Sequence, residues 1–415
     1  MSLRKTFRML GPGLLWAGAA IGVSHLVQST RAGADFGFIM IWILIFALAT
    51  KYPFFEFGPR YATATGNSLI TGYSRIGRWA LILYVVLTIS TMFTIQAAVT
   101  VVTGGLVAYI FGISLNNSML CSIVLIVGMI FLITGRYALL DKLIKFIIIL
   151  LAIYTVTAVI YALNKGYQPD PQFIRAFDPA KGAHLLFLFA FIGWMPAPID
   201  VSVWHSNWTI AKKEEIGFVP KMKTALMDFN IGYIGTAIMA LGFLVLGSLL
   251  MYGSGEKLSP KGAEFAGQLI SLYTESIGKW AFPVIAAAAL TTMLSTTLTC
   301  MDAYPRILKT ATEEMFPSIR RKGRSVFFIW LIVLVAGTII LITSLSGTMN
   351  FMVDLATTLS VVTAPALAIL NYAVITHSHV PDDAKPKRGM RIYARICIVL
   401  LGILCLSYLG YKLCF

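Results

Sequence analysis

The sequence predicts an all-α integral membrane protein with two five-helix halves of inverted topology and an eleventh helix after them. Hydrophobic residues make up 58% and charged residues 12% of the 415 residues, and the mean hydropathy is +0.81, which excludes an ordinary soluble domain. Apolar runs of roughly 17 to 25 residues, the length that crosses a bilayer core, recur about eleven times. Two of them are interrupted at corresponding places, as inverted repeats are.

The apolar runs follow one another without a charged or Pro/Ser-rich linker, so we expect one domain over residues 1–415. Its first repeat is expected at about 10–163, its second at about 183–376, and the extra helix at about 391–412. The expected spans are 13–32, 37–62, 80–110, 117–134, 142–163, 184–210, 228–252, 278–300, 325–345, 350–376 and 391–412.

Basic residues gather in every second loop and so predict the orientation. The net charge is +15, and its placement between apolar runs favours a role in membrane orientation over nucleic-acid binding. The short loops near 114–117 and 344–349 contain no Lys or Arg. We therefore expect an inner-membrane protein with a cytoplasmic N-terminus, an external C-terminus and lipid around it; the oligomeric state is not predicted. The basic residues are Arg4, Lys5, Arg8, Arg75, Arg78, Arg136, Lys142, Lys212, Lys213, Lys221, Lys223, Arg320, Arg321, Lys322, Arg324, Lys385, Lys387, Arg388 and Arg391.

The first span is interrupted at its middle. The segment GPGLLWAGAAIGVSHLVQSTRAGADFGF, from Gly11 to Phe38, has Gly22, Ser24 and His25 at membrane depth. An unsatisfied backbone group in lipid costs several kcal/mol, so a break there persists only where protein, solute or water supplies partners. The pattern therefore predicts a break that lines a site.

The sixth span is interrupted in the same way. Its segment GWMPAPID, from Gly193 to Asp200, contains Pro196 and Pro198, which remove helix donors. A matching pair of interrupted spans in two halves indicates the substrate site of an inverted-repeat transporter. The segment also supplies an acid at membrane depth, Asp200, which predicts either a functional carboxylate or a structural N-cap.

Several motifs together resemble the Nramp family of divalent-metal transporters: the GPG at Gly11, AGADFG from Ala32, ATATG before Asn67, and SVVTAP in the tenth span. The resemblance implies a LeuT-type fold with a substrate site between the broken first and sixth helices. It extends weakly across most of the chain, including the basic loop after the sixth span.

The residues of the family's metal site are replaced in this sequence. Counted without gaps, the family's Asp-Pro-Gly-Asn falls on Gly22, Val23, Ser24 and His25. The family's Met-Pro-His falls either on Met195, Pro196 and Ala197 or on Ala197, Pro198 and Ile199, and its His is absent in both registers. The two acids of the family's third-helix proton route fall on Gln96 and Val99.

These replacements predict a changed substrate. A divalent cation needs anionic oxygen or several strong donors in place of its water, and Gly22 offers none. We expect the donors Ser24, His25, Gln28, Ser29 and Thr30 to gather instead at the positive end of the second half of the first helix. The expected substrate-binding residues are Gly22, Ser24, His25, Gln28, Met195, Ala197 and Asp200, with Gln96 as a candidate for the coupling route and with no metal ligands or cofactor.

The sequence thus predicts a secondary transporter of a small non-metal solute, with bicarbonate or a small carboxylate preferred. The alternative is a divalent cation transporter for manganese, iron or magnesium that uses His25, backbone carbonyls and Asp200. A sensor that binds without flux also stays open, as do sodium coupling, another proton path and passive exchange. An intramembrane enzyme is not expected, because no nucleophile–base pair or HExxH motif occurs. A channel is disfavoured because few charges lie in the spans.

Overall fold

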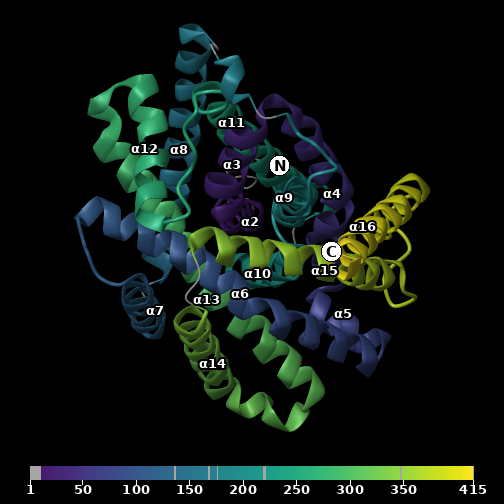
Figure 1. The fold of residues 1–415 in the computed structure, drawn as a ribbon. Coiled ribbons are helices and arrows are strands. Elements are labelled where there is room, and N and C mark those ends of the chain that lie inside the picture. Colours follow the sequence, from purple (N-terminus) through teal and green to yellow (C-terminus); the bar gives the residue numbers. More distant parts are fainter. Residues whose placement is uncertain are drawn as a thin grey trace.

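The computed structural model describes residues 11–134, 137–166, 169–174, 176–217, 221–345 and 348–414, and this part of the chain is helical without any strand (Figure 1). The predicted basic residues Arg4, Lys5, Arg8 and Arg136 lie outside it. The longer helices are α2 (Pro12–Ala20), α3 (Thr30–Phe36), α4 (Met40–Thr65), α5 (Leu69–Ile76), α6 (Arg78–Phe111), α7 (Asn117–Ile133), α8 (Tyr137–Lys165), α9 (Gly182–Trp194), α10 (Val201–Ile216), α11 (Met222–Leu250), α12 (Gly262–Ile277), α13 (Phe282–Met315), α14 (Gly323–Ser344), α15 (Met349–Thr376) and α16 (Arg388–Cys414).

All eleven predicted spans coincide with helices, and the two interrupted spans are broken. A π-helical turn, η1 (Ser24–Ser29), joins α2 to α3, and the non-helical residues 195–200 separate α9 from α10. The helices α5 and α12 were not predicted, and α13 continues to Met315, well beyond the predicted end of the eighth span. The repeat boundaries at 10–163 and 183–376 stay predictions.

The outside of the bundle is apolar. Within the described residues, seven helical segments are long and apolar enough to cross a membrane, and three shorter apolar helices accompany them. Large side chains such as Trp42 and Leu406, each 70% exposed, project outward from α4 and α16. Such a surface is stable only against hydrocarbon, so the chain is an integral membrane protein.

The broken first span lies inside the bundle and packs on α11 (Figure 1). A Cβ at Gly13 would lie 2.1 Å from the carbonyl oxygen of Asp228, so only glycine allows this approach. The Asp228 carboxylate also accepts hydrogen bonds from the amides of Gly11 at 3.1 Å and Gly13 at 2.7 Å. The GPG sequence therefore anchors the start of α2 to α11.

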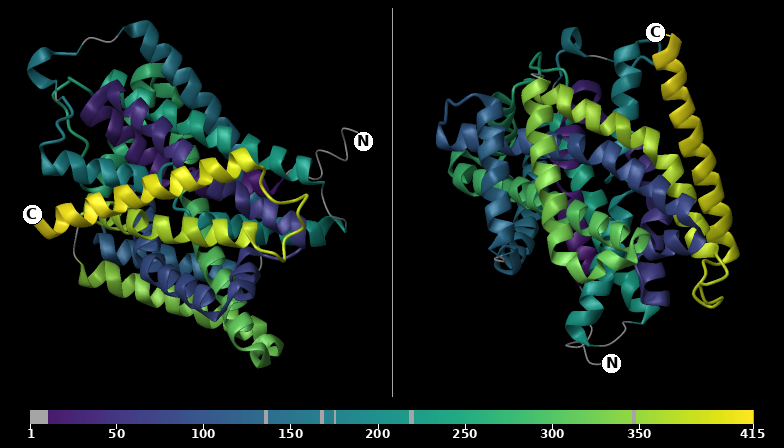
Figure 2. Two further views of the ribbon diagram at one scale, coloured as in Figure 1. Left: turned by 90° about the vertical axis from the view of Figure 1, so that its right-hand side faces the viewer. Right: turned by 90° about the horizontal axis from the view of Figure 1, so that it is seen from below.

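The eleventh span, α16, lies at the edge of the bundle against α4 and α15 (Figure 2). Pro53 in α4 has no amide hydrogen to give to the carbonyl of Ala49, and the Tyr393 hydroxyl of α16 donates to that carbonyl instead. The start of α2 and the end of α16 lie at opposite ends of the bundle (Figure 2).

Candidate functional site

A small cavity lies between the two broken spans. Its volume is about 30 Å³, which is enough for about two water molecules. The broken spans contribute most of its wall, and α6 and α13 close it. The lining residues are Ala19, Ala20, Gly22, Val23, Ser24, Ile95, Val99, Trp194, Ala197, Pro198, Val201, Trp204, Thr296, Cys300 and Tyr304.

The first break is narrow and closely packed. The helix α2 ends at Ala20, with Ile21 as its C-cap. The amides of His25 and Leu26 bond to the carbonyl of Gly22 at 3.1 and 2.9 Å, which starts the π-helical turn. A Cβ at Gly22 would lie 2.8 Å from both Cγ2 and Oγ1 of Thr296 on α13. The position that the resemblance assigns to a metal-binding Asp is therefore covered by the Thr296 side chain.

The His25 ring is fully buried and points away from the cavity toward α11. Its Nε2 lies 3.0 Å from the carbonyl oxygen of Thr236, and its Nδ1 lies 2.7 Å from Oγ of Ser24. A carbonyl only accepts, so Nε2 carries a hydrogen. The Ser24 hydroxyl donates its hydrogen to the carbonyl oxygen of Ala20 at 2.7 Å, and its oxygen lies within hydrogen-bond distance of Nδ1. His25 thus has partners at both nitrogens and does not line the cavity.

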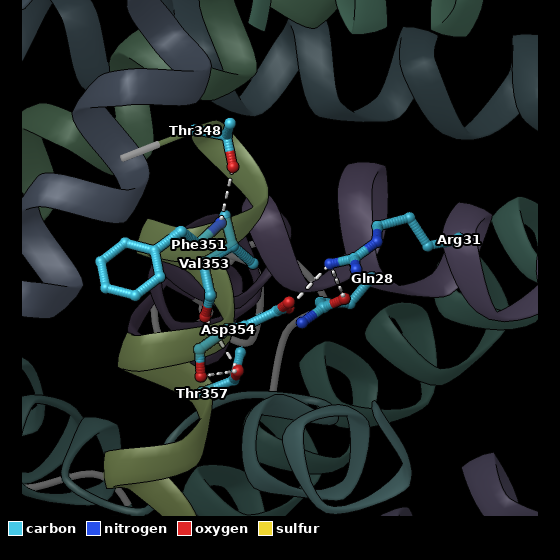
Figure 3. A network of polar contacts seen from close by, with 7 residues as sticks. All are labelled: Gln28, Arg31, Thr348, Phe351, Val353, Asp354 and Thr357. Carbon is cyan, nitrogen blue, oxygen red and sulfur yellow. Dashed lines mark hydrogen bonds and ion pairs between the residues drawn. The ribbon is translucent and has the colours of Figure 1, made fainter. Parts of the chain in front are cut away.

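Gln28 belongs to a polar network farther along the first span, between α3 and α15 (Figure 3). Nη1 of Arg31 donates to Oε1 of Gln28 at 3.1 Å and to Oδ1 of Asp354 at 2.8 Å. Arg31 and Asp354 also line a second, larger cavity of about 450 Å³ beside Phe187 and Lys412. Gln28 therefore lies outside the central cavity, and its carbonyl helps to position Arg31.

Of the predicted donors, Ser24 lines the central cavity, whereas His25, Gln28, Ser29 and Thr30 do not. Ser24, His25 and Gln28 bond to protein groups, and the Ser29 hydroxyl donates to Sδ of Met195 at 3.5 Å. Thr30 is buried but does not line the cavity. The sequence could not show this, because the direction of each side chain depends on how the π-helical turn packs on α11.

The residues of the sixth break take three different places. Ala197 lines the cavity, whereas Met195 packs in a separate apolar cluster with residues of α4 and α9. Asp200 stands just before α10 but does not cap it with its side chain. Its Oδ2 instead accepts from the hydroxyl of Tyr304 at 3.0 Å, and Tyr304 itself lines the cavity. Asp200 therefore bonds to a cavity-lining residue but does not line the cavity itself.

A buried lysine at the sixth break was not among the predicted site residues. Lys51 on α4 is 1% exposed. Its Nζ donates to the carbonyls of Gly193 at 2.6 Å and Ala197 at 3.2 Å. A charged residue inside a predicted span is a signal of function by itself, and it was available in the sequence.

Gln96 lies between α6 and α13. Its Nε2 donates to Oγ1 of Thr100 at 3.2 Å and to the carbonyl of Thr297 at 3.5 Å. Its neighbours Ile95 and Val99 line the cavity and Gln96 does not. Within the described residues, no group of three or more His, Cys, Asp or Glu side chains is placed to hold a metal ion.

The family follows from the sequence profile described as natural resistance-associated macrophage protein-like (Nramp), which matches residues 13–410. The chain belongs to the Nramp family. An uncharacterized protein of Pasteurella multocida is 40% identical over 304 residues, which are 72% of this chain and 69% of that protein.

Solved structures with the same fold include other transporters. A manganese transporter of Eremococcus coleocola has a TM-score of 0.69 at 14% identity, over 97% of this chain and 86% of the other. MhsT, solved with L-phenylalanine, has a TM-score of 0.60 at 13% identity, over 95% of this chain and 98% of the other. The nucleobase-cation-symport-1 transporter Mhp1 has a TM-score of 0.57 at 14% identity, over 98% and 93%. The LeuT-type fold predicted for this Nramp-family chain is confirmed.

Proposed function

We propose that this Nramp-family protein is a secondary transporter whose central cavity takes a small non-metal solute. The observation that carries the proposal is the contact between Gly22 and Thr296. A Cβ at residue 22 would come within 2.8 Å of Thr296, so the wall where the family has a carboxylate is closed by a short side chain. A divalent ion would meet hydroxyl, thiol and indole groups but no carboxylate or imidazole among the cavity-lining residues.

The wall favours a solute that accepts hydrogen bonds. The indole Nε1 of Trp204 is buried and has no hydrogen-bond partner within the described residues, and Trp204 lines the cavity. A buried donor without a partner costs about 1–3 kcal/mol, which a bound acceptor would recover. Bicarbonate and small carboxylates are the first class to test, because they supply acceptor oxygens. The cavity must widen during alternating access to admit them.

A divalent metal ion is the second candidate, and family membership and the likeness to a manganese transporter support it. It would require His25 to leave the Thr236 carbonyl, or Asp200 to leave the Tyr304 hydroxyl. Each exchange breaks a buried hydrogen bond, and no second anionic ligand lies on the cavity wall. The structure therefore favours the non-metal solute.

The test is uptake by the purified protein in liposomes, with labelled bicarbonate, formate, acetate and manganese as separate substrates. Trp204→Phe keeps the ring and removes the donor, so it should lower the affinity for the transported acceptor about tenfold. Trp208→Phe is the matched control on the same helix, since Trp208 packs edge-on against Trp204 but does not line the cavity. Saturable manganese uptake that both variants retain would contradict the proposal.

A further inference from the structure

The break in the sixth span leaves carbonyls that the helix cannot satisfy. The chain is non-helical from Met195 to Asp200, and Pro196 and Pro198 have no amide hydrogens to give. The carbonyl of Gly193 belongs to the last turn of α9, which ends at Trp194, and the carbonyl of Ala197 lies within the break. The C-terminal end of a helix carries partial negative charge, so these oxygens form a place that attracts a cation.

A carboxylate adds to the negative character of this place. Asp200 is buried with 3% exposure, and Oδ2 bonds to Tyr304. Its Oδ1 has no well-aligned donor within the described residues, although the amides of Asp200 and Val201 lie near the carboxylate. In transporters with discontinuous helices, monovalent cations are coordinated by backbone carbonyl oxygens of the unwound segment and by the C-terminal end of the adjoining half-helix.

A cationic side chain of the protein itself lies beside these carbonyls. Nζ of Lys51 reaches both carbonyls from α4, at 2.6 and 3.2 Å. No carboxylate lies within 4 Å of it in the described part of the chain, and the Asp200 charge acts on it from farther away. The ammonium is therefore bound chiefly by the backbone oxygens of the break, as a free cation would be.

We propose that Lys51 is a tethered cation, which fills a monovalent-cation site at the sixth-span break and holds the break in shape without sodium. The inference rests on these contacts and not on the proposed solute. Removal of the ammonium leaves two buried carbonyls and a buried carboxylate without their cation. A small monovalent cation, or an alkylammonium that replaces the lost side chain, should then bind at the vacated place.

The test measures the melting temperature (Tm) of the full-length protein in lipid nanodiscs, with choline, sodium, potassium or n-propylammonium as the only added cation at equal ionic strength. The wild type should have the same Tm in all four salts. Lys51→Ala should have a lower Tm in choline and should recover by about 3 °C or more in n-propylammonium, which matches the atoms removed, or in sodium. Lys181→Ala is the control, because it removes a lysine whose side chain is 65% exposed.

A second variant separates the charge from the packing of the side chain. Lys51→Met keeps most of the stem without the charge, so its Tm should fall as far as that of Lys51→Ala and should not respond to n-propylammonium, because the stem fills the space. A Lys51→Met Tm equal to that of the wild type would overturn the inference. A wild-type Tm that rises in sodium but not in the other salts would also overturn the inference. This wild-type measurement decides the question even if neither Lys51 variant folds.

Discussion

The first and sixth spans are both interrupted, but different interactions stabilise the two breaks. At the first break, Gly22 packs against Thr296 of α13, and the chain returns to a helix through bonds to the Gly22 carbonyl. At the sixth break, six residues are non-helical and the buried ammonium of Lys51 binds the carbonyls of Gly193 and Ala197. Close packing thus stabilises the short first break, whereas a charged donor from another helix stabilises the longer sixth break.

We expect the strongest destabilisation from a substitution at the sixth break. Lys51→Met leaves two buried carbonyls without donors and Asp200 without its nearest positive charge, so we expect the free energy of unfolding to fall by about 3–5 kcal/mol. Asp200→Asn in the same chain should restore part of this loss, since it removes the uncompensated charge. Denaturation of the wild type, both single variants and the double variant measures the coupling, which should be about 1 kcal/mol or more. Additive losses would show that the two groups act independently.

Alanine substitutions at Gly193 and Gly22 should show which of the two breaks is packed more rigidly. A Cβ at Gly193 would lie 2.4 Å from the backbone oxygen of Thr357, which has little freedom to move. A Cβ at Gly22 would meet the side chain of Thr296, which can rotate. We expect Gly193→Ala to cost about 3 kcal/mol and Gly22→Ala about 1 kcal/mol, measured as loss of unfolding free energy. The reverse order would show that the first break is the more rigid of the two.

The imidazole of His25 should contribute to the stability of the protein and not to binding of the solute. His25→Leu removes the donor to the Thr236 carbonyl and the side-chain partner of Ser24, at a cost of about 1–2 kcal/mol. The KM for the transported solute should stay within about twofold of the wild-type value, because the ring points toward α11. A tenfold rise in KM with unchanged Tm would instead place His25 in the binding site.

The smallest effect is expected away from both breaks, where Arg31 of α3 meets Asp354 of α15 (Figure 3). The Asp354 side chain is 44% exposed, and half-exposed ion pairs contribute about 1 kcal/mol or less. Asp354→Asn should therefore lower the Tm only slightly, and the difference from the wild type should shrink further in high salt. A loss as large as that of Lys51→Met would mean that this pair, and not the sixth break, holds the helices together.

The sequence allowed the fold to be predicted better than the site. The length of the apolar runs predicted the position of every span, and glycine and proline residues predicted both breaks. Both signals are local, because each depends only on the residues of the span itself. Which groups meet across a break depends on how each helix is rotated. The contact of Thr296 with Gly22 and the turn of His25 toward Thr236 therefore could not be predicted. Lys51 is different, since a lysine inside an apolar run marks a buried charge, although its carbonyl partners needed the structure.

The proposed function requires that the cavity between the two broken spans does not coordinate a metal ion. Anomalous X-ray scattering from crystals of the wild-type protein soaked in manganese can detect such coordination. We predict no anomalous peak between Gly22 and Ala197, even when manganese is seen at surface carboxylates. A strong peak there, with ligands within coordination distance, would contradict the proposed function.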